Sequence, residues 1–333
     1  MNLMNNTSIS IVRTPFQLFN CIEATNFFNK DGINILICIY KNDVDRTLFE
    51  EILIHYPWSK LYFFKLNSFT RIFYPIILNN IFKNYKEIEY CFFGLITSYI
   101  VHSINQINAK NNILIDDGNE TFLIANNIKS NLYKEKFKNT LIDKILGKNF
   151  ELLFLKDLKI FTFFNLESYL LSNEVIKNEY SNFKKSINNL LIDKEIFFIG
   201  SNLIDNYIEK EYFEETLKNT IKYFSDYKVI YIPHRYEDIN YLKSLSIKYG
   251  FELKKFSTIL ELAILQYGKK PSGLVTIRST ALETLAYLYD IKFLNIIELD
   301  LSKLKKNNQV EEYKNLYNNY LEKNIPLVKV NLY

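Results

Sequence analysis

The feature that most constrains the fold is a repeated pairing of a short, continuous apolar run with a segment of helical periodicity. Runs such as 34–40 and 228–232 are apolar at nearly every position, rather than at every second one. Strands that are buried on both faces have this composition, and the helices that follow them supply the cover. The pattern therefore predicts an α/β protein with parallel sheets covered on both faces.

The alternation occurs twice along the chain, which indicates two successive Rossmann-like halves. Strands are expected at 8–12, 34–40, 61–66, 90–96 and 112–115 in the first half, and at 195–199, 228–232, 251–256, 274–277, 292–297 and 326–330 in the second. The length of 333 residues suits two domains of moderate size. A polar, helix-like stretch at 167–193 lies between the halves. We therefore expect one domain at 1–170, a crossing at 171–193 and a second domain at 194–333.

The charge balance excludes a surface dominated by nucleic-acid binding. Lys and Arg number 41 against 37 Asp and Glu, which leaves a net charge of +4. The amino terminus does not read as a signal peptide, and the most apolar window, 90–104, is too short and too polar to span a membrane. We expect a cytoplasmic protein. Its basic, aromatic stretch 134–148 leaves open a peripheral contact with the inner membrane face.

Several motifs that would define other classes are missing. Cys21, Cys38 and Cys91 are far apart among apolar residues, so we expect buried thiols rather than a zinc site or disulfides. The eight glycines are scattered singly and form neither a dinucleotide-binding motif nor a P-loop. We therefore expect no metal and no cofactor.

One polar cluster follows the predicted strand 228–232, where Pro233, His234 and Arg235 stand in sequence. Side chains at the carboxyl end of a parallel strand project at the sheet edge where ligands bind. His234 could donate a hydrogen bond to a phosphate oxygen, although a strand-end histidine is often only a surface residue. His55 and His102 lie in contexts that favour structural roles.

A second cluster follows the predicted strand 274–277. Thr280 and Glu283 have the spacing of a capping box, and Ser279 precedes them. A helix that begins here would direct its free N–H groups and positive dipole end at an anion. Capping boxes are common, so the motif alone indicates no more than a helix start.

A third cluster, Asp116, Asp117 and Gly118, follows the predicted strand 112–115. Asp-Gly is first of all a turn signal, and two acids can simply solvate a turn. Adjacent carboxylates also repel each other, which can raise the pKa of one and make it a usable general base. Both interpretations remain open from the residues alone.

The order of these motifs resembles that of bacterial sialyltransferases, most closely glycosyltransferase family 52, which contains lipooligosaccharide and capsule sialyltransferases. The resemblance rests on segments 14–18, 116–118, 199–201, 231–235 and 279–283, and it spans nearly the whole chain. It implies a GT-B architecture, in which two Rossmann-like domains with parallel sheets face each other across a cleft and the second domain holds the donor. The sequence departs from the family in one motif, because proline precedes His234 here, whereas the family has histidine followed by proline.

The resemblance also implies roles for individual residues. Asp117 would be the general base, Asp116 would tune or replace it, and His234 would stabilise the departing phosphate. Asp205, in the loop after the strand 195–199, is a reserve base. The residues expected at the substrate and donor sites are Thr14, Gln17, Gly118, Gly200, Ser201, Pro233, Arg235, Ser279 and Thr280.

The expected reaction is an inverting transfer of sialic acid, or a related nonulosonic acid, from a CMP-activated donor to a hydroxyl of a surface glycan. A monophosphate leaving group gathers less charge than a diphosphate, so protein donors could serve without a metal ion. One alternative is a glycosyltransferase that uses a UDP- or GDP-sugar. Another is a glycan-binding protein without catalytic activity. The sequence does not determine the oligomeric state.

Overall fold

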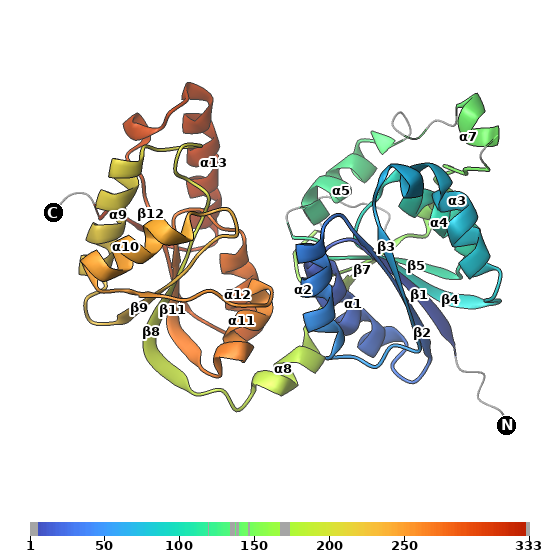
Figure 1. Cartoon of the computed structure of the whole chain (residues 1–333), viewed down its shortest axis with the longest axis horizontal. Coiled ribbons are helices and arrows are strands. Elements are labelled where there is room, and N and C mark those ends of the chain that lie inside the picture. Colours follow the sequence, from blue (N-terminus) through green and yellow to red (C-terminus); the bar gives the residue numbers. More distant parts are fainter. Residues whose placement is uncertain are drawn as a thin grey trace. The chain divides into compact units, whose positions relative to one another are not determined.

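The computed structural model describes residues 6–118, 120–133, 137, 140–145, 147–166 and 174–330. Its contacts divide the chain into two compact units, Met1–Lys185 and Ser186–Tyr333. Each unit is built around a sheet of parallel strands with helices packed against it (Figure 1). The prediction of two Rossmann-like halves is therefore confirmed.

The sheet of the first unit has seven strands in the order β3-β2-β1-β4-β5-β6-β7. The strands are β1 (Thr7–Val12), β2 (Ile33–Tyr40), β3 (Lys60–Lys65), β4 (Ile88–Phe93), β5 (Asn111–Ile115), β6 (Lys159–Thr162) and β7 (Glu174–Lys177). The chain order reverses between β1 and β4, and this reversal is the point at which open α/β sheets bind ligands, beyond the carboxyl ends of the strands.

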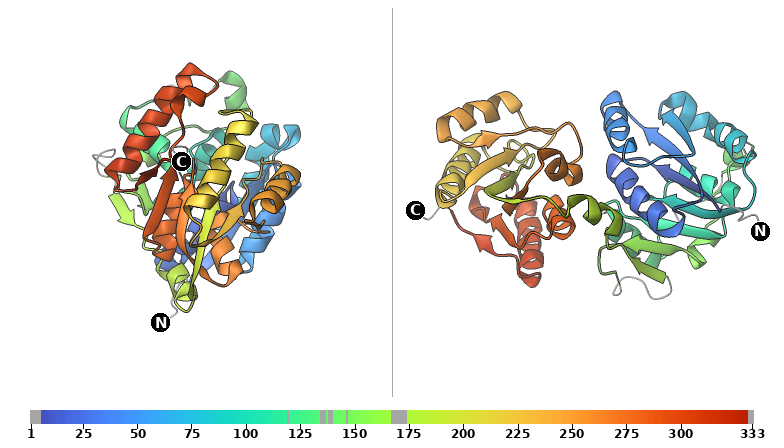
Figure 2. Two further views of the ribbon diagram at one scale, coloured as in Figure 1. Left: turned by 90° about the vertical axis from the view of Figure 1, so that its left-hand side faces the viewer. Right: turned by 90° about the horizontal axis from the view of Figure 1, so that it is seen from below.

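Helices cover both faces of the first sheet, as the views in Figure 2 show. The helices are α1 (Pro15–Phe28), α2 (Asp43–Leu53), α3 (Ser68–Phe82), α4 (Ser98–Ile107), α5 (Glu120–Lys129), α7 (Leu141–Ile145) and α8 (Ser181–Ile187), with a 3-10 turn η1 (Leu153–Lys156). Helix α1 packs beside α2, and α3 packs beside α4. The core between α3, α4 and the sheet is almost entirely aliphatic and aromatic.

The sheet of the second unit has six strands in the order β10-β9-β8-β11-β12-β13. The strands are β8 (Ile192–Ile199), β9 (Lys228–Ile232), β10 (Glu252–Leu253), β11 (Lys270–Thr276), β12 (Phe293–Ile297) and β13 (Leu327–Val328). The helices are α9 (Lys210–Tyr223), α10 (Ile239–Tyr249), α11 (Leu260–Tyr267), α12 (Ala281–Tyr289) and α13 (Asn307–Glu322), with a 3-10 turn η2 (Leu301–Lys303). The strand order reverses between β8 and β11, as it does between β1 and β4 in the first unit.

The expected crossing at 171–193 is partly wrong. Its residues Glu174–Lys177 form β7, the edge strand of the first sheet, and Ile192 and Asp193 already belong to β8. The two units divide between Lys185 and Ser186, inside α8. The polar run 178–186 that suggested a crossing forms most of α8 and the residues before it, whereas β7 is an edge strand with one paired side and half of its residues exposed.

Other expectations are confirmed in detail. The three cysteines are buried free thiols. His102 is buried, and its Nδ1 accepts a hydrogen bond of 3.1 Å from the backbone N–H of Asn149, which is a structural role. Helix α3 runs from Ser68 to Phe82 with Pro75 inside it.

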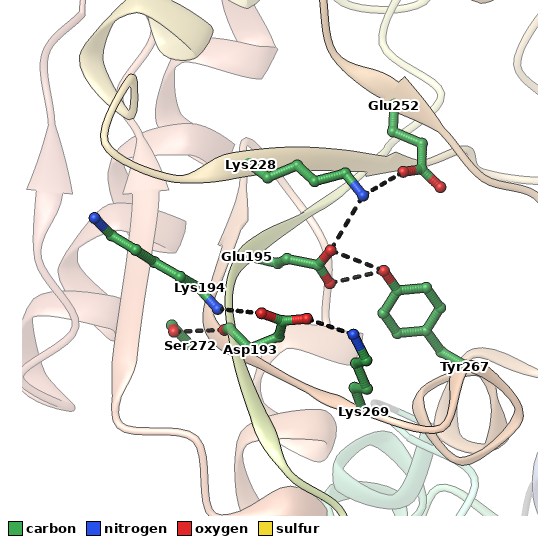
Figure 3. A network of polar contacts seen from close by, with 8 residues as sticks. All are labelled: Asp193, Lys194, Glu195, Lys228, Glu252, Tyr267, Lys269 and Ser272. Carbon is green, nitrogen blue, oxygen red and sulfur yellow. Dashed lines mark hydrogen bonds and ion pairs between the residues drawn. The ribbon is translucent and has the colours of Figure 1, made fainter.

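A polar network lies at the end of the second sheet where its strands begin, away from their carboxyl ends (Figure 3). Glu195 is buried in the first half of β8, and its two carboxylate oxygens lie 2.9 and 2.7 Å from the Tyr267 hydroxyl, which donates to them. Lys228 pairs with Glu195 at 3.2 Å and with Glu252 at 2.7 Å, which links the starts of β8, β9 and β10. This network therefore connects the strands near their amino ends, away from the carboxyl ends where the candidate site residues lie.

Candidate active-site residues at the two switch points

The switch point of the first sheet brings Thr14 and Asp117 together, although they are 103 residues apart in the sequence. Thr14 follows β1, Asp117 follows β5, and the Thr14 hydroxyl donates a hydrogen bond of 3.0 Å to the Asp117 Oδ1. The same hydroxyl oxygen accepts the Gln17 N–H at 3.1 Å and so caps α1. One side chain therefore both starts the helix and holds the carboxylate.

Asp117 is half-buried, and this burial raises the pKa of its carboxyl above the usual value. Side-chain hydrogen bonds from Gln17 and Thr14 stabilise the charged form and oppose this rise in the pKa. Gly118, with φ of 62°, provides the left-handed turn that follows the acid. A partly exposed carboxylate with a raised pKa at a switch point has the properties of a general base.

Gln17 is fully buried, and its position depends on Gly94 at the end of β4. The Gln17 Oε1 accepts the Arg13 N–H at 2.8 Å. A Cβ added at Gly94 would overlap the Gln17 side chain, so only glycine fits there. Gln17 thus fixes the turn after β1 through its hydrogen bond to the Arg13 backbone. The sequence signal for this buried glutamine is Gly94, a glycine that directly follows a buried strand.

Asp116 points away from Asp117 and has a different environment. Its side chain is fully buried, and its Oδ2 accepts the Phe163 N–H at 3.0 Å. Its backbone oxygen accepts a hydrogen bond of 3.2 Å from the Asn20 side chain. Burial raises the pKa of Asp116 to about 7. The carboxyl ties the end of β5 to the segment after β6.

The cause of the raised pKa values differs from the one we expected. The adjacent acids were expected to repel each other, whereas burial is the main cause of the upward pKa shift for both Asp116 and Asp117. Successive side chains at a strand end point to opposite sides, which separates the two carboxylates.

At the switch point of the second sheet, Ser201 joins the two central strands. Ser201 follows β8, is buried, and its hydroxyl donates to the backbone oxygen of Arg278, which follows β11. The Arg278 guanidinium lies over the rings of Tyr207 and Tyr313, at 4.4 and 5.5 Å, and pairs with Glu312. Ser201, which was expected at the donor site, thus links the segments that follow β8 and β11.

The turn after β9 is organised by Glu237, which sequence reasoning missed. The Glu237 carboxylate accepts the His234 backbone N–H at 2.6 Å and the Tyr231 hydroxyl at 2.6 Å. A Cβ at Gly200 would overlap this carboxylate, so the residue that follows β8 has to be glycine to leave room for it. Burial raises the pKa of Glu237 to about 7. A glutamate three residues after His234 and a glycine after β8 were the available signals.

The His234 imidazole is half-buried in the turn after β9. Its Nδ1 accepts the Tyr236 N–H at 3.4 Å, which assigns the ring proton to Nε2. Burial, and then the neighbouring Arg235, lower the pKa of the imidazole. Arg235 is exposed and its guanidinium lies 4.8 Å from the Tyr236 ring centre. Pro233 is half-buried and fixes the backbone before the histidine.

The capping box expected at Thr280 and Glu283 is wrong. Thr280 already has helical dihedral angles, φ −69° and ψ −20°, and its side chain makes no capping hydrogen bond. Glu283 instead pairs at 2.7 Å with Lys323, the residue that follows α13. Ser279 is half-buried just before α12, and Thr280 is exposed. The start of α12 therefore has no side-chain cap at its N-cap residue.

Asp205 and a neighbouring cavity lie on the β8–β9 side of the second unit. Asp205 is exposed, has φ of 65°, and pairs weakly with Lys305 at 3.4 Å. A cavity of about 260 Å³ opens beside Glu237. The cavity is lined by Asn202, Ile204, Asp205, Lys210, Tyr236, Glu237, Asp238, Tyr241 and Leu242. No cluster of three or more metal-ligating acids, histidines or cysteines occurs among the described residues.

The fold resembles that of solved nucleotide-sugar enzymes. A 2,6-sialyltransferase from Photobacterium sp. JT-ISH-224, solved with CMP and lactose, is 12% identical over 96% of this chain and 78% of its own, with a TM-score of 0.52. The S. aureus MnaA–UDP structure is 11% identical over 94% and 88%, with a TM-score of 0.51. The UDP-GlcNAc 2-epimerase of Neisseria meningitidis, bound to UDP-GlcNAc, is 10% identical over 95% and 92%, with a TM-score of 0.50.

No protein-family model matches the sequence, and no curated protein matches it. At these identities the structural matches establish the fold alone. Together with the two parallel sheets and their repeated strand order, they place the chain in the GT-B fold class. Within the described residues, no helix is long and apolar enough to cross a membrane.

Proposed function

We propose that this protein is an inverting glycosyltransferase that moves sialic acid, or a related nonulosonic acid, from a CMP-activated donor to a hydroxyl of a surface glycan. The observation that carries the proposal is the Asp117 carboxylate, which Thr14 holds at the switch point of the first sheet with a raised pKa. The GT-B fold and the motif order of the sequence support the same reading. An acceptor hydroxyl needs such a base, since it becomes nucleophilic only as it loses its proton.

In this mechanism Asp117 takes the proton of the acceptor hydroxyl. The acceptor oxygen forms a bond to the anomeric carbon while the bond from that carbon to the CMP phosphate oxygen breaks, and the electron pair leaves with CMP. The neutral His234 donates a hydrogen bond from Nε2 to the phosphate, and the start of α12 at Ser279 adds backbone N–H groups. Glu237 positions the His234 turn and does not touch the substrate.

The proposal includes metal independence. The His234 imidazole and the backbone N–H groups at the start of α12 would stabilise the charge that CMP gains on leaving, without a metal ion. The test of this point is transfer in the presence of a chelator, with added Mg²⁺ as the comparison. An unchanged rate in the chelator supports the assignment. A rate that collapses and returns with Mg²⁺ contradicts it.

The central experiment measures CMP release from CMP-sialic acid with an acceptor screen. Asp117→Asn and His234→Ala should each lower turnover by roughly 100-fold or more. Asp205→Asn is the matched comparison, since Asp205 is the competing base and lies exposed on the second unit. Near-normal turnover in the first two variants would end the assignment, and a large loss in Asp205→Asn would move the base to that residue.

The donor nucleotide is decided by a separate measurement. Two of the similar structures carry UDP or UDP-GlcNAc, which keeps a UDP-sugar as the second candidate. Thermal unfolding with CMP, UDP and GDP separates the donors, since a ligand that binds only the folded chain raises its melting temperature. A protein that releases no nucleotide with any acceptor, and yet binds glycans, would be the non-catalytic alternative.

A further inference from the structure

Helix α3 exposes an apolar stripe along its length. Its exposed apolar side chains are Phe69, Ile72, Phe73 and Ile76, with exposed fractions of 63%, 48%, 36% and 56%. The spacing of three, four and seven residues places all of them on one face of the helix. The core is served by other positions of α3, Leu78, Ile81 and Phe82, which are buried. The stripe is therefore a second apolar face, in addition to the one that packs on the sheet.

Helix α7 contributes two more exposed apolar side chains. Leu141 and Ile145, four residues apart, are each 77% exposed. The segment after α7 is anchored to α3, because Lys148 pairs with Asp143 of α7 at 3.1 Å and lies 5.6 Å from the ring centre of Tyr74. The stripe of α3 and the exposed pair of α7 therefore belong to one region of the first unit (Figure 1).

The charges around this surface are positive. Helix α3 contains no acidic residue, and Lys83 is exposed at its end. Among the described residues of the stretch 129–148, three are lysines, Lys129, Lys144 and Lys148, and one is acidic, Asp143. Lys144 is exposed between Leu141 and Ile145. Apolar and aromatic side chains with a rim of lysines are the composition of a helix that lies in a membrane interface.

We propose that the stripe of α3, together with Leu141 and Ile145, docks on the anionic surface of a lipid bilayer. Apolar side chains would enter the headgroup region while the lysines meet acidic phosphates. A second copy of the chain fits this surface less well, since a two-fold contact would oppose lysines to lysines. Helix α3, with its 15 residues, is too short to span a bilayer and so would lie along it. The proposal does not depend on the proposed catalytic function.

The test is co-sedimentation of the full chain with vesicles. Vesicles of equal parts phosphatidylglycerol and phosphatidylcholine should bind the protein, and pure phosphatidylcholine vesicles should bind it much less. Phe69→Ser with Phe73→Ser should lower the partition coefficient at least about tenfold, because two aromatic rings no longer enter the interface. Ile247→Ser is the matched control, since Ile247 is a single apolar side chain, 87% exposed, on the second unit. It should bind as the unmodified protein does.

A charge variant and a solution measurement complete the test. Lys144→Glu should weaken binding to the anionic vesicles and reduce its dependence on salt. Thermal unfolding and CMP release without lipid should stay unchanged in all variants, which separates a failure of docking from a failure of folding or function. Equal vesicle binding by the Phe69→Ser, Phe73→Ser protein overturns the proposal. The proposal is also overturned if the unmodified protein does not bind vesicles but forms a dimer in solution, and the Phe69→Ser, Phe73→Ser variant is a monomer.

Discussion

The carboxylate of Glu237 occupies the space beside Gly200 in which any other residue would place its Cβ atom. This carboxylate also binds the Tyr231 hydroxyl and the His234 N–H, so the residue that follows β8 determines how the turn after β9 is held. The position of the His234 imidazole thus depends on a close approach between Gly200, just after β8, and the turn after β9. That dependence can be measured.

Gly200→Ala should destabilise the second unit and displace Glu237. The added methyl group overlaps the carboxylate and the Tyr231 ring, and overpacking of this kind costs about 1–3 kcal/mol of unfolding free energy. Urea unfolding measures the loss. If the proposed function holds, His234 is misplaced as well, and turnover falls more than the substrate KM rises.

A double variant distinguishes this cause from a general effect of alanine. In Gly200→Ala with Glu237→Ala the methyl group finds the space that the carboxylate leaves. The double variant should therefore lose less unfolding free energy than the sum of the two single losses. Additive losses would show that Gly200 and Glu237 do not interact in the way described here.

Asp116→Asn should change how stability depends on pH. The pKa of Asp116 is raised to about 7 by burial, so the folded chain holds a proton that the unfolded chain has already released above about pH 4. Stability contributed by this group is complete at low pH and falls as pH rises toward the folded pKa, by at most about 1.4 kcal/mol per pH unit. Asparagine can still accept the Phe163 N–H and carries no such proton.

The measurement is urea unfolding at about pH 5 and about pH 8. Asp116→Asn should gain stability relative to the unmodified protein as pH rises between these values. Asp157→Asn is the control, because Asp157 is exposed in the same unit and its variant should show no such gain. A pH-independent difference for Asp116→Asn would show that Asp116 is ionised throughout this range.

The second half of the chain could be predicted closely from its sequence, and the first half less so. Strand β9 was expected at its observed bounds, and Gly250 ends α10 in the left-handed conformation that only glycine adopts freely. Strand β7 was missed because an edge strand needs no continuous apolar run. Helix α4 was missed because His102 and Ser103 interrupt its apolar pattern, although both are buried.

For the site residues, the sequence predicted positions but not contacts. The sequence placed Asp117 and His234 at strand ends, because a polar residue after an apolar run marks a sheet edge. It could not show that Thr14 binds Asp117, since that contact joins residues 103 positions apart. Nor could it show that Glu283 pairs with Lys323 instead of capping α12. Contacts of this kind depend on which strands become neighbours, and local patterns do not contain that information.

Thr14→Val should affect both α1 and Asp117, and Thr14→Ser should affect neither. Valine removes the oxygen that caps α1, at a cost of about 1 kcal/mol in urea unfolding. It also removes a hydrogen bond that stabilises the Asp117 carboxylate, so the pKa of Asp117 rises further. If Asp117 is the general base, the acidic limb of the pH–rate profile then moves to higher pH. Loss of stability in Thr14→Ser as well would point to packing instead of the hydroxyl.

The network in Figure 3 should govern stability without affecting catalysis. Tyr267→Phe removes the hydroxyl that donates to the buried Glu195, and should lower the unfolding free energy by about 1 kcal/mol or more. Lys269→Ala is the matched comparison, because Lys269 pairs at 2.7 Å with Asp193 at the same edge, but both side chains are exposed. Solvent screens an exposed pair, so its loss should have a much smaller effect.

Neither variant should change turnover, since this edge holds the starts of the strands and the candidate catalytic residues follow their ends. Urea unfolding and the CMP-release assay on the same preparations test both halves of this expectation. A larger loss of stability from Lys269→Ala than from Tyr267→Phe would mean that the exposed pair, and not the buried carboxylate, holds the strands β8 and β11 together at this edge.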